Sequence, residues 1–198
     1  MPGAPRFFCP APLESGLRLE LPATAARHVQ VLRLQPGAAI TLFGHLHSST
    51  PGGEFSATIS AMGRQHVEAV VGAHDPVERE AARQLHLAIG IPANERMDWL
   101  VEKATELGAA SIQPLMTERS VVRLDAQRSV KKLAHWQSIA IAASEQCGRN
   151  HVATVHAPVT LSQWLRQTPP PHTTTDAALI LSLRPDACPL PQWRGGPG

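Results

Sequence analysis

The first third of the chain contains short stretches in which hydrophobic and polar residues alternate. There are four of them, at residues 17–21, 39–43, 54–59 and 66–71. A period of two is typical of β-strands that bury one face. One helix interrupts the strands, with Thr24 as its expected N-cap and His28, Val31 and Leu32 on one face. Short strands at close spacing predict a small β-barrel over residues 1–74.

The pattern changes beyond residue 74. Residues 75–82 are charged and lack β character, which is typical of a linker. Apolar runs of strand length then alternate with helical spacing, and this predicts an α/β domain with parallel strands over residues 83–198. The expected strands are 84–90, 111–115 and 178–183. The expected helices run from Asn94 to Gly108, from Arg128 to Gln146 before Gly148, and from Leu161 to Arg166.

Ligands of parallel sheets bind beyond the carboxyl ends of the strands. In this chain those ends lead into residues 91–94, 117–120 and 184–186. No GxGxxG or P-loop pattern occurs, and this disfavours an ordinary dinucleotide or nucleoside-triphosphate site.

Composition narrows the protein class. Hydrophobic residues make up 43% of the chain and the net charge is +2, which allows a packed core and permits nucleic-acid binding without demanding it. The three cysteines are far apart and form no CxxC pair, so neither a disulfide framework nor a zinc site is expected. His45 and His47 lack further ligands nearby, and we expect no metal. With no signal peptide and no membrane-length apolar run, a cytoplasmic protein without membrane contact is expected.

Two polar segments are candidates for chemistry. The loop at residues 117–123 carries Arg119 and Arg123, which could recognise phosphate or a base, or could form a solvated loop with an internal ion pair. Residues 142–150 place Glu145 and Arg149 around a helix C-terminus, and that segment is either a reactive site or a helix cap.

Two further arginines are candidates for RNA contact. Arg6 and Arg33 lie beside the predicted barrel, where they could bind phosphates or form surface salt bridges.

Six stretches together resemble the ribosomal RNA small subunit methyltransferase E family. They are Arg6–Phe8, His28–Gly37, Leu42–Gly44, Glu95–Gly108, Pro114–Ser120 and Trp136–Arg149. The last two are the most specific, because secondary structure gives no reason for their polar residues to occur in that order. The likeness runs in register from Arg6 to about Pro191.

The resemblance implies a PUA-like N-terminal barrel that holds RNA, followed by a SPOUT-type α/β methyltransferase domain. It also implies S-adenosylmethionine as cofactor, 16S ribosomal RNA of the small subunit as substrate, and a homodimer. The family product is N3-methyluridine. N3 of uracil carries a proton, so a base must remove it and a cation must stabilise the resulting charge. Glu145 is the candidate base, and Arg119 or Arg149 the candidate cation.

The chain departs from the family after Arg194. The family continues there with an apolar strand, a Gly-Pro-Glu-Gly-Gly loop and a later loop rich in Leu, Arg and Thr, whereas this chain ends at Gly198. Of the donor site we expect only the first loop, with Leu183 and Pro185, and a domain that is incomplete at its C-terminus. Two alternatives stay open: a catalytically inactive RNA-binding fragment, and a small-molecule transferase on a general α/β scaffold.

Overall fold

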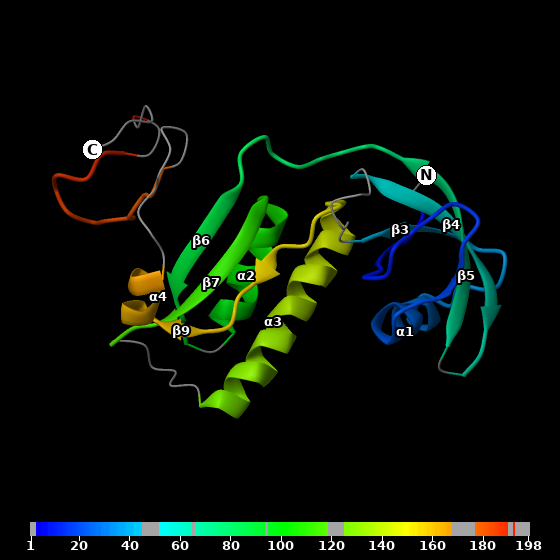
Figure 1. Ribbon diagram of the computed structural model, residues 1–198, viewed down its shortest axis with the longest axis horizontal. Coiled ribbons are helices and arrows are strands. Elements are labelled where there is room, and N and C mark those ends of the chain that lie inside the picture. Colours follow the sequence, from blue (N-terminus) through cyan, green and yellow to red (C-terminus); the bar gives the residue numbers. More distant parts are fainter. Residues whose placement is uncertain are drawn as a thin grey trace. The chain divides into compact units, whose positions relative to one another are not determined.

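The computed structural model of the protein describes residues 3–44, 52–64, 66–93, 95–118, 125–167, 177–189 and 192 (Figure 1). The chain divides into two compact units, Met1–Pro158 and Val159–Gly198. The first unit contains two β-sheets with separate hydrophobic cores, and the described residues of the second contain a short strand and one helix.

The first sheet has five strands in the order β1-β3-β4-β5-β2. They are β1 (Arg6–Phe8), β2 (Arg18–Glu20), β3 (Ala39–Phe43), β4 (Glu54–Met62) and β5 (Val67–Asp75). β1 runs parallel to β3, and the other pairs are antiparallel. Within the described residues β1 and β2 are the two edges and do not pair with each other, so the predicted closed barrel is not confirmed.

The predicted alternation gives this sheet its buried face. On β4 the buried side chains include Phe55, Ala57 and Ile59, two residues apart, and β5 repeats the pattern. Helix α1 (Ala23–Val31) packs Ala25, Ala26 and Val29 into the same core. Two details of the α1 prediction are wrong. Pro22, not Thr24, is the N-cap, and Val31 and Leu32 are exposed because the buried face centres on Val29.

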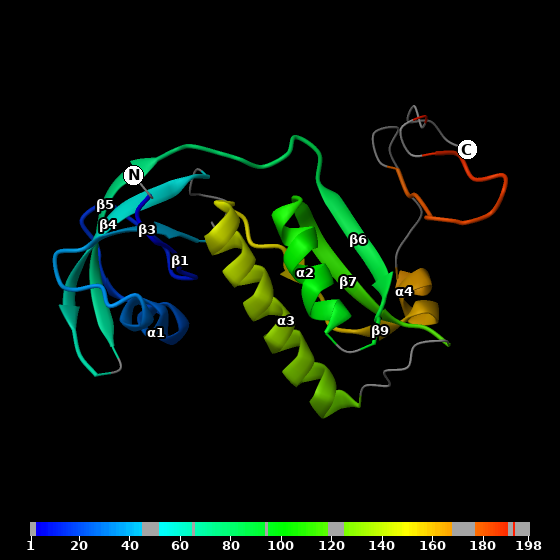
Figure 2. The ribbon, with the colours of Figure 1, turned by 180° about the vertical axis from the view of Figure 1, so that it is seen from behind.

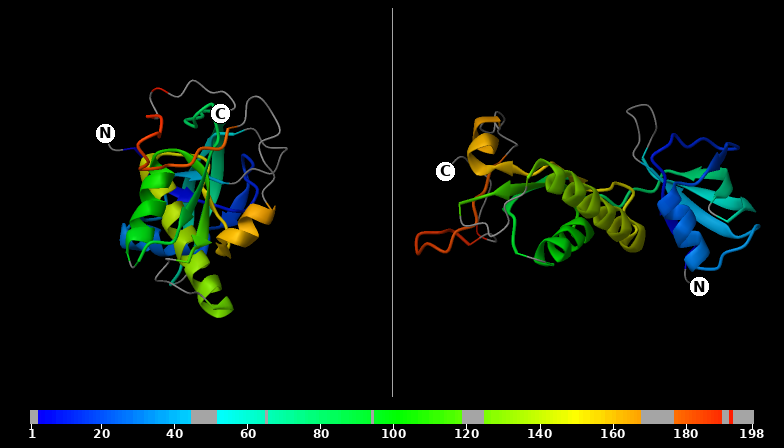
Figure 3. Two further views of the ribbon diagram at one scale, coloured as in Figure 1. Left: turned by 90° about the vertical axis from the view of Figure 1, so that its left-hand side faces the viewer. Right: turned by 90° about the horizontal axis from the view of Figure 1, so that it is seen from below.

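The second sheet has parallel strands in the order β6-β7-β8, as the alternation of strand and helix predicted. They are β6 (Leu85–Gly90), β7 (Ala109–Met116) and β8 (Thr154–Val155), of which β8 was not predicted. Helices α2 (Arg96–Glu106) and α3 (Ala126–Cys147) follow β6 and β7. Both lie on the same side of the sheet (Figures 2 and 3) and bury Met97, Val101 and Trp136 against it.

Local sequence sets the ends of these two helices. Gly108 and Gly148 have φ values of 98° and 86° and follow the last turns, as expected of glycine at a helix C-terminus. Asp125 caps α3, since its side chain accepts the N–H of Arg128 at 2.7 Å. The N-cap of α2 is Glu95, and the predicted cap Asn94 lies outside the described residues.

The second unit contains β9 (Val159–Thr160) and α4 (Leu161–Gln167), and this confirms the short helix predicted at 161–166. Thr160 and Gln163 cap it reciprocally through Thr160 Oγ1 and Gln163 Oε1. The strand predicted at 178–183 is wrong, because residues 177–183 form no strand and Ile180 and Leu181 are 92% and 86% exposed. An apolar run becomes a strand only where a neighbouring strand completes its hydrogen bonds.

Candidate functional site

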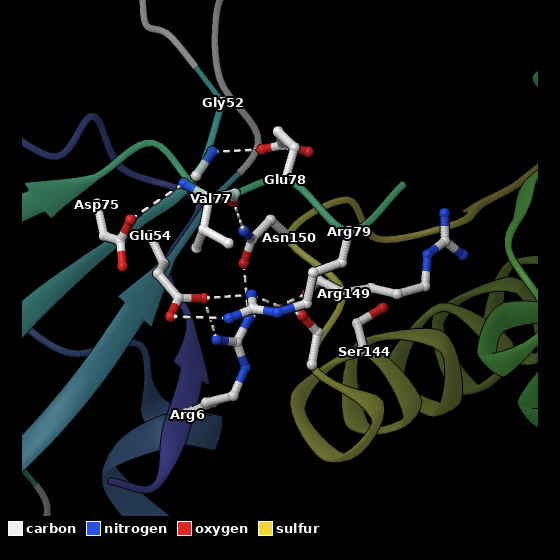
Figure 4. A network of polar contacts seen from close by, with 12 residues as sticks. Arg6, Gly52, Glu54, Asp75, Val77, Glu78, Arg79, Ser144, Arg149 and Asn150 are labelled. Carbon is white, nitrogen blue, oxygen red and sulfur yellow. Dashed lines mark hydrogen bonds and ion pairs between the residues drawn. The ribbon is translucent and has the colours of Figure 1, made fainter. Parts of the chain in front are cut away.

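Arg6 and Arg79 meet at Glu54 beside the end of α3, and the side chain of Arg149 points away from them (Figure 4). With their acidic and amide partners they form a group that we call the arginine cluster: Arg6, Glu54, Arg79, Glu80, Arg149 and Asn150. Strand β1 supplies Arg6 and β4 supplies Glu54, while Arg79 and Glu80 precede β6. Arg149 and Asn150 follow the helix. The cluster therefore joins the two sheets of the first unit.

Glu54 binds two of the arginines. Its carboxylate accepts hydrogen bonds from Arg6 Nη1 and, at 2.8 Å, from Arg79 Nη1. Burial raises the pKa of Glu54, but the hydrogen bonds from Arg79 and Arg6 outweigh it and leave the pKa below its ordinary value. Glu54 is therefore held as the carboxylate.

Asn150 connects Arg6 to the segment before β6. Its Oδ1 accepts from Arg6 Nη2 at 2.7 Å, and its Nδ2 donates to the carbonyl of Val77 at 2.8 Å. The side chain is almost fully buried, so both ends of the amide are satisfied inside the protein.

Arg149 uses its guanidinium entirely within the fold. Nε and Nη2 bind the carboxylate of Glu80, and Nη1 donates to the carbonyls of Thr105 and Ala109 at 2.8 and 2.9 Å. Thr105 lies in the last turn of α2, where carbonyls lack partners in the helix and a cation is favoured. The side chain of Arg149 is 8% exposed. These contacts favour a structural role for the residue.

Glu145 joins α3 to the first sheet. Its Oε1 accepts the backbone N–H of Phe8 at 3.0 Å, and its Oε2 lies 3.5 Å from His28 Nδ1. Burial raises the pKa of Glu145 above its ordinary value, although the N–H of Phe8 and the imidazole of His28 act in the opposite direction. A carboxylate whose pKa is raised is a stronger base than an ordinary carboxylate.

The position of these residues bears on their role. Arg149 contacts Ala109, the first residue of β7, so the arginine cluster lies at the amino edge of the second sheet. Ligands of parallel sheets bind at the carboxyl edge, about 23 Å away along an eight-residue strand. The structure thus brings Arg6, Glu145 and Arg149 together, but at the edge opposite to the expected ligand site.

The carboxyl edge of the second sheet is described in part. Strands β6 and β7 lead there into residues 91–93 and 117–118, and the N–H of Ile91 donates to the carbonyl of Leu115 at 3.0 Å.

The other predicted residues lie apart from the cluster. Arg119 and Arg123 are outside the described residues. Arg33 is exposed and has a φ of 55°, in the left-handed region. Leu183 and Pro185 belong to the second unit, and both are exposed.

In the part of the chain that the structure describes, no group of three or more His, Cys, Asp or Glu side chains could hold a metal ion. No helix in that part is long and apolar enough to cross a bilayer.

Sequence reasoning missed Glu54, Arg79 and Glu80. The only signal for the last two was charge density without helical spacing in residues 75–82. Glu54 begins a strand and gave no signal, because its partners Arg6 and Arg79 are 48 and 25 residues away.

Comparison with known proteins assigns the family. Residues 79–188 match the sequence model of the RNA methyltransferase domain. The structure superposes on ribosomal RNA small subunit methyltransferase E of Neisseria gonorrhoeae with a TM-score of 0.86 and 35% identity, covering 99% of this chain and 77% of that one. The chain belongs to the ribosomal RNA small subunit methyltransferase E family. The mixed α/β architecture is that of the family.

Two further relatives of this methyltransferase family support the assignment. A methyltransferase of Legionella pneumophila, solved with bound S-adenosylmethionine, matches with a TM-score of 0.78 and 36% identity over 84% of this chain and 67% of that one. The Bacillus subtilis family member is 32% identical over 127 residues, which are 64% of this chain and 48% of that protein. The chain spans about half the length of this curated relative.

Proposed function

We propose that this chain carries part of an S-adenosylmethionine-dependent methyltransferase that modifies 16S ribosomal RNA of the small subunit, at N3 of a uridine. The observation that supports it most is the match of 99% of the chain, at a TM-score of 0.86, to a family member solved with S-adenosylmethionine bound. The proposal includes a homodimer in the cytoplasm.

The proposed division of labour follows the two sheets. Residues 1–74 would form the PUA-like RNA-binding part, 75–82 the linker and 83–198 the methyltransferase part. Of the two predicted RNA ligands Arg6 and Arg33, Arg33 is the better placed, because it is exposed. The side chain of Arg6 is only 14% exposed and is bound to Glu54. Arg123 remains a proposed RNA ligand from sequence.

Leu183 and Pro185 are the proposed cofactor contacts in this chain. Both are apolar and exposed, and so are available to an adenosine group that would cover them. Bound S-adenosylmethionine would supply the methyl group as a reactive sulfonium. The protein has to align it with the base and remove the N3 proton.

The predicted catalytic residues differ in how well their positions suit removal of the N3 proton and stabilisation of the uracil anion. Arg119 remains the proposed stabiliser of the uracil anion. Glu145 has the raised pKa that suits a base, and Arg149 was the second candidate cation, but both lie at the amino edge with their groups engaged. Within one chain we infer that these two residues act mainly by positioning.

The test is methyl transfer by the chain itself. Purified protein, tritiated S-adenosylmethionine and small subunits that lack the modification should give labelled 16S RNA, and mass spectrometry of its nucleosides should show N3-methyluridine. Methylation at another atom would refute the N3 assignment. If the protein binds the RNA but shows no heat of binding for S-adenosylmethionine in titration calorimetry, the alternative of an RNA-binding part without catalysis holds.

A further inference from the structure

The first half of α3 carries a face of positive charge. Its charged members are Arg128, Lys131 and Lys132, and His135 lies on the same face. They are spaced three, four and seven residues from the first, which places them on one side of an α-helix. All four side chains are exposed. We call this surface the cationic face.

The two lysines in it have no acidic partner among the described residues. Arg128 pairs with Asp125 at 3.4 Å and His135 with Asp98 at 2.8 Å, but neither Lys131 nor Lys132 makes an ion pair there. Residues 126–144 of α3 also contain no Asp or Glu. The net charge of the chain is only +2, so this concentration of unpaired positive charge is local.

The helix dipole and ion pairing do not explain the position of the lysines. They lie in the second turn of α3, toward the positive end of the helix dipole, where cations gain nothing. Lys103, the only other lysine, shows the contrasting arrangement, because its Nζ binds Glu102 at 2.8 Å and Glu106 at 2.9 Å.

The cationic face lies toward the carboxyl edge of the second sheet. Helix α3 begins after the carboxyl end of β7, and α2 begins after that of β6. His135 contacts Asp98 in the first turn of α2, so the face adjoins the start of both helices. Parallel sheets bind their ligands at this edge, which is opposite to the arginine cluster.

We propose that the cationic face of α3 binds the phosphate backbone of the substrate RNA, with Lys131 and Lys132 as the principal contacts. Unpaired, exposed lysines on one helix face match a polyanion, since each phosphate neutralised releases counterions. This inference rests on the proposed function for the identity of the RNA, but it does not require methyl transfer.

The experiment compares salt dependence of RNA binding. The wild-type chain and Lys131→Ala/Lys132→Ala are titrated with a 16S RNA transcript over a series of KCl concentrations. The double variant should bind more weakly, and the slope of log K against log salt should be about 1.4 to 1.8 smaller in magnitude, or about 0.7 to 0.9 for each lost contact. An unchanged slope would overturn the proposal.

Two matched variants control the result. Lys103→Ala also removes one lysine, but a paired one, and should leave the slope unchanged. Lys131→Arg/Lys132→Arg should restore wild-type binding, because it preserves both charges. If the arginine variant binds as weakly as the alanine variant, charge is not the cause and the proposal is wrong. Thermal melting of each variant shows that the fold is intact.

The result that refutes the proposed function differs from the result that refutes RNA binding by the cationic face. If the wild-type chain makes no N3-methyluridine while the alanine variant still shows a smaller salt slope, the proposed methylation is refuted. The proposal that the cationic face binds RNA is then still supported. If RNA binding is unchanged and sedimentation velocity shows that the alanine variant dissociates, the face contacts a second copy of the chain instead.

Discussion

Glu145, near the end of α3, accepts a hydrogen bond from the backbone N–H of Phe8, 137 residues earlier in the chain. The carboxylate thereby satisfies a backbone group in the first sheet from a helix that packs on the second. The contact shows that Glu145 holds the helix to the first sheet, while the catalytic role expected of this residue stays a prediction.

Replacing Glu145 with Gln should separate the hydrogen bond from the charge. Gln still accepts the N–H of Phe8, but it removes a carboxylate whose burial raises its pKa. A raised pKa means that the folded state holds the proton longer than the unfolded state, so Glu145 costs stability as the pH rises above about 4.5. Glu145→Gln should therefore melt no lower than wild type at pH 7.

The control for that variant is Glu145→Ala, which also removes the acceptor and should cost about 1 to 3 kcal/mol. A lower melting temperature for Glu145→Gln at pH 7 would mean that the contact with His28 outweighs the cost of burial.

Arg149 and Arg119 should behave oppositely. Arg149→Met leaves Glu80 and two carbonyls without their donor, and should destabilise the protein by about 2 to 4 kcal/mol in urea unfolding. Arg119→Ala should lower methylation much more than stability. If Arg149→Met keeps its stability and loses methylation, Arg149 has a catalytic role after all.

Glu54 should make the fold sensitive to acid. The pKa of Glu54 is lower in the folded state, so its contribution is complete above about pH 4.5 and is lost as the pH falls through the lowered value. Urea unfolding between pH 3 and 7 should show a loss of stability that Glu54→Gln reduces. Equal pH dependence in both proteins would contradict this assignment.

Replacing Arg33 with Gly should raise the stability of the protein and weaken its binding to RNA. The φ of 55° at Arg33 costs an L-residue roughly 1 kcal/mol, which glycine avoids. Arg33→Gly should raise the free energy of unfolding and also reduce the salt slope of RNA binding by about 0.7 to 0.9. Arg27→Ala, on the exposed side of α1, is the control for general loss of charge. An unaltered slope in Arg33→Gly would exclude Arg33 from the RNA interface.

Gly44 should not tolerate a side chain. A Cβ atom there would overlap the carbonyl oxygen of Cys9. The backbone of Cys9 is fixed, because its N–H donates to the carbonyl of Phe43 at 2.8 Å. Backbone atoms cannot give way as a flexible side chain can, so Gly44→Ala should destabilise the protein by about 2 kcal/mol. Gly3→Ala meets no atom within 4 Å and should be neutral in the same unfolding assay.

The sequence by itself determined the elements whose signals are local. Period-two alternation predicted 39–43 as a strand, and β3 has those bounds. Glycine at 108 and 148 predicted where α2 and α3 end, because a left-handed residue at a helix end is a local requirement. The polar motifs at 114–120 and 136–149 predicted the family, which the comparisons confirmed.

Only the tertiary structure decided which partners the polar residues have. From sequence, the end of α3 could be either a reactive site or a helix cap. The partners of Glu145 and Arg149 come from residues up to 137 positions away. Such contacts leave no periodicity in the sequence. The strand expected at 178–183 fails for a related reason, since its ladder depends on a neighbouring strand that local pattern cannot supply. Strand propensity is a property of a segment, whereas the pairing of strands depends on the whole fold.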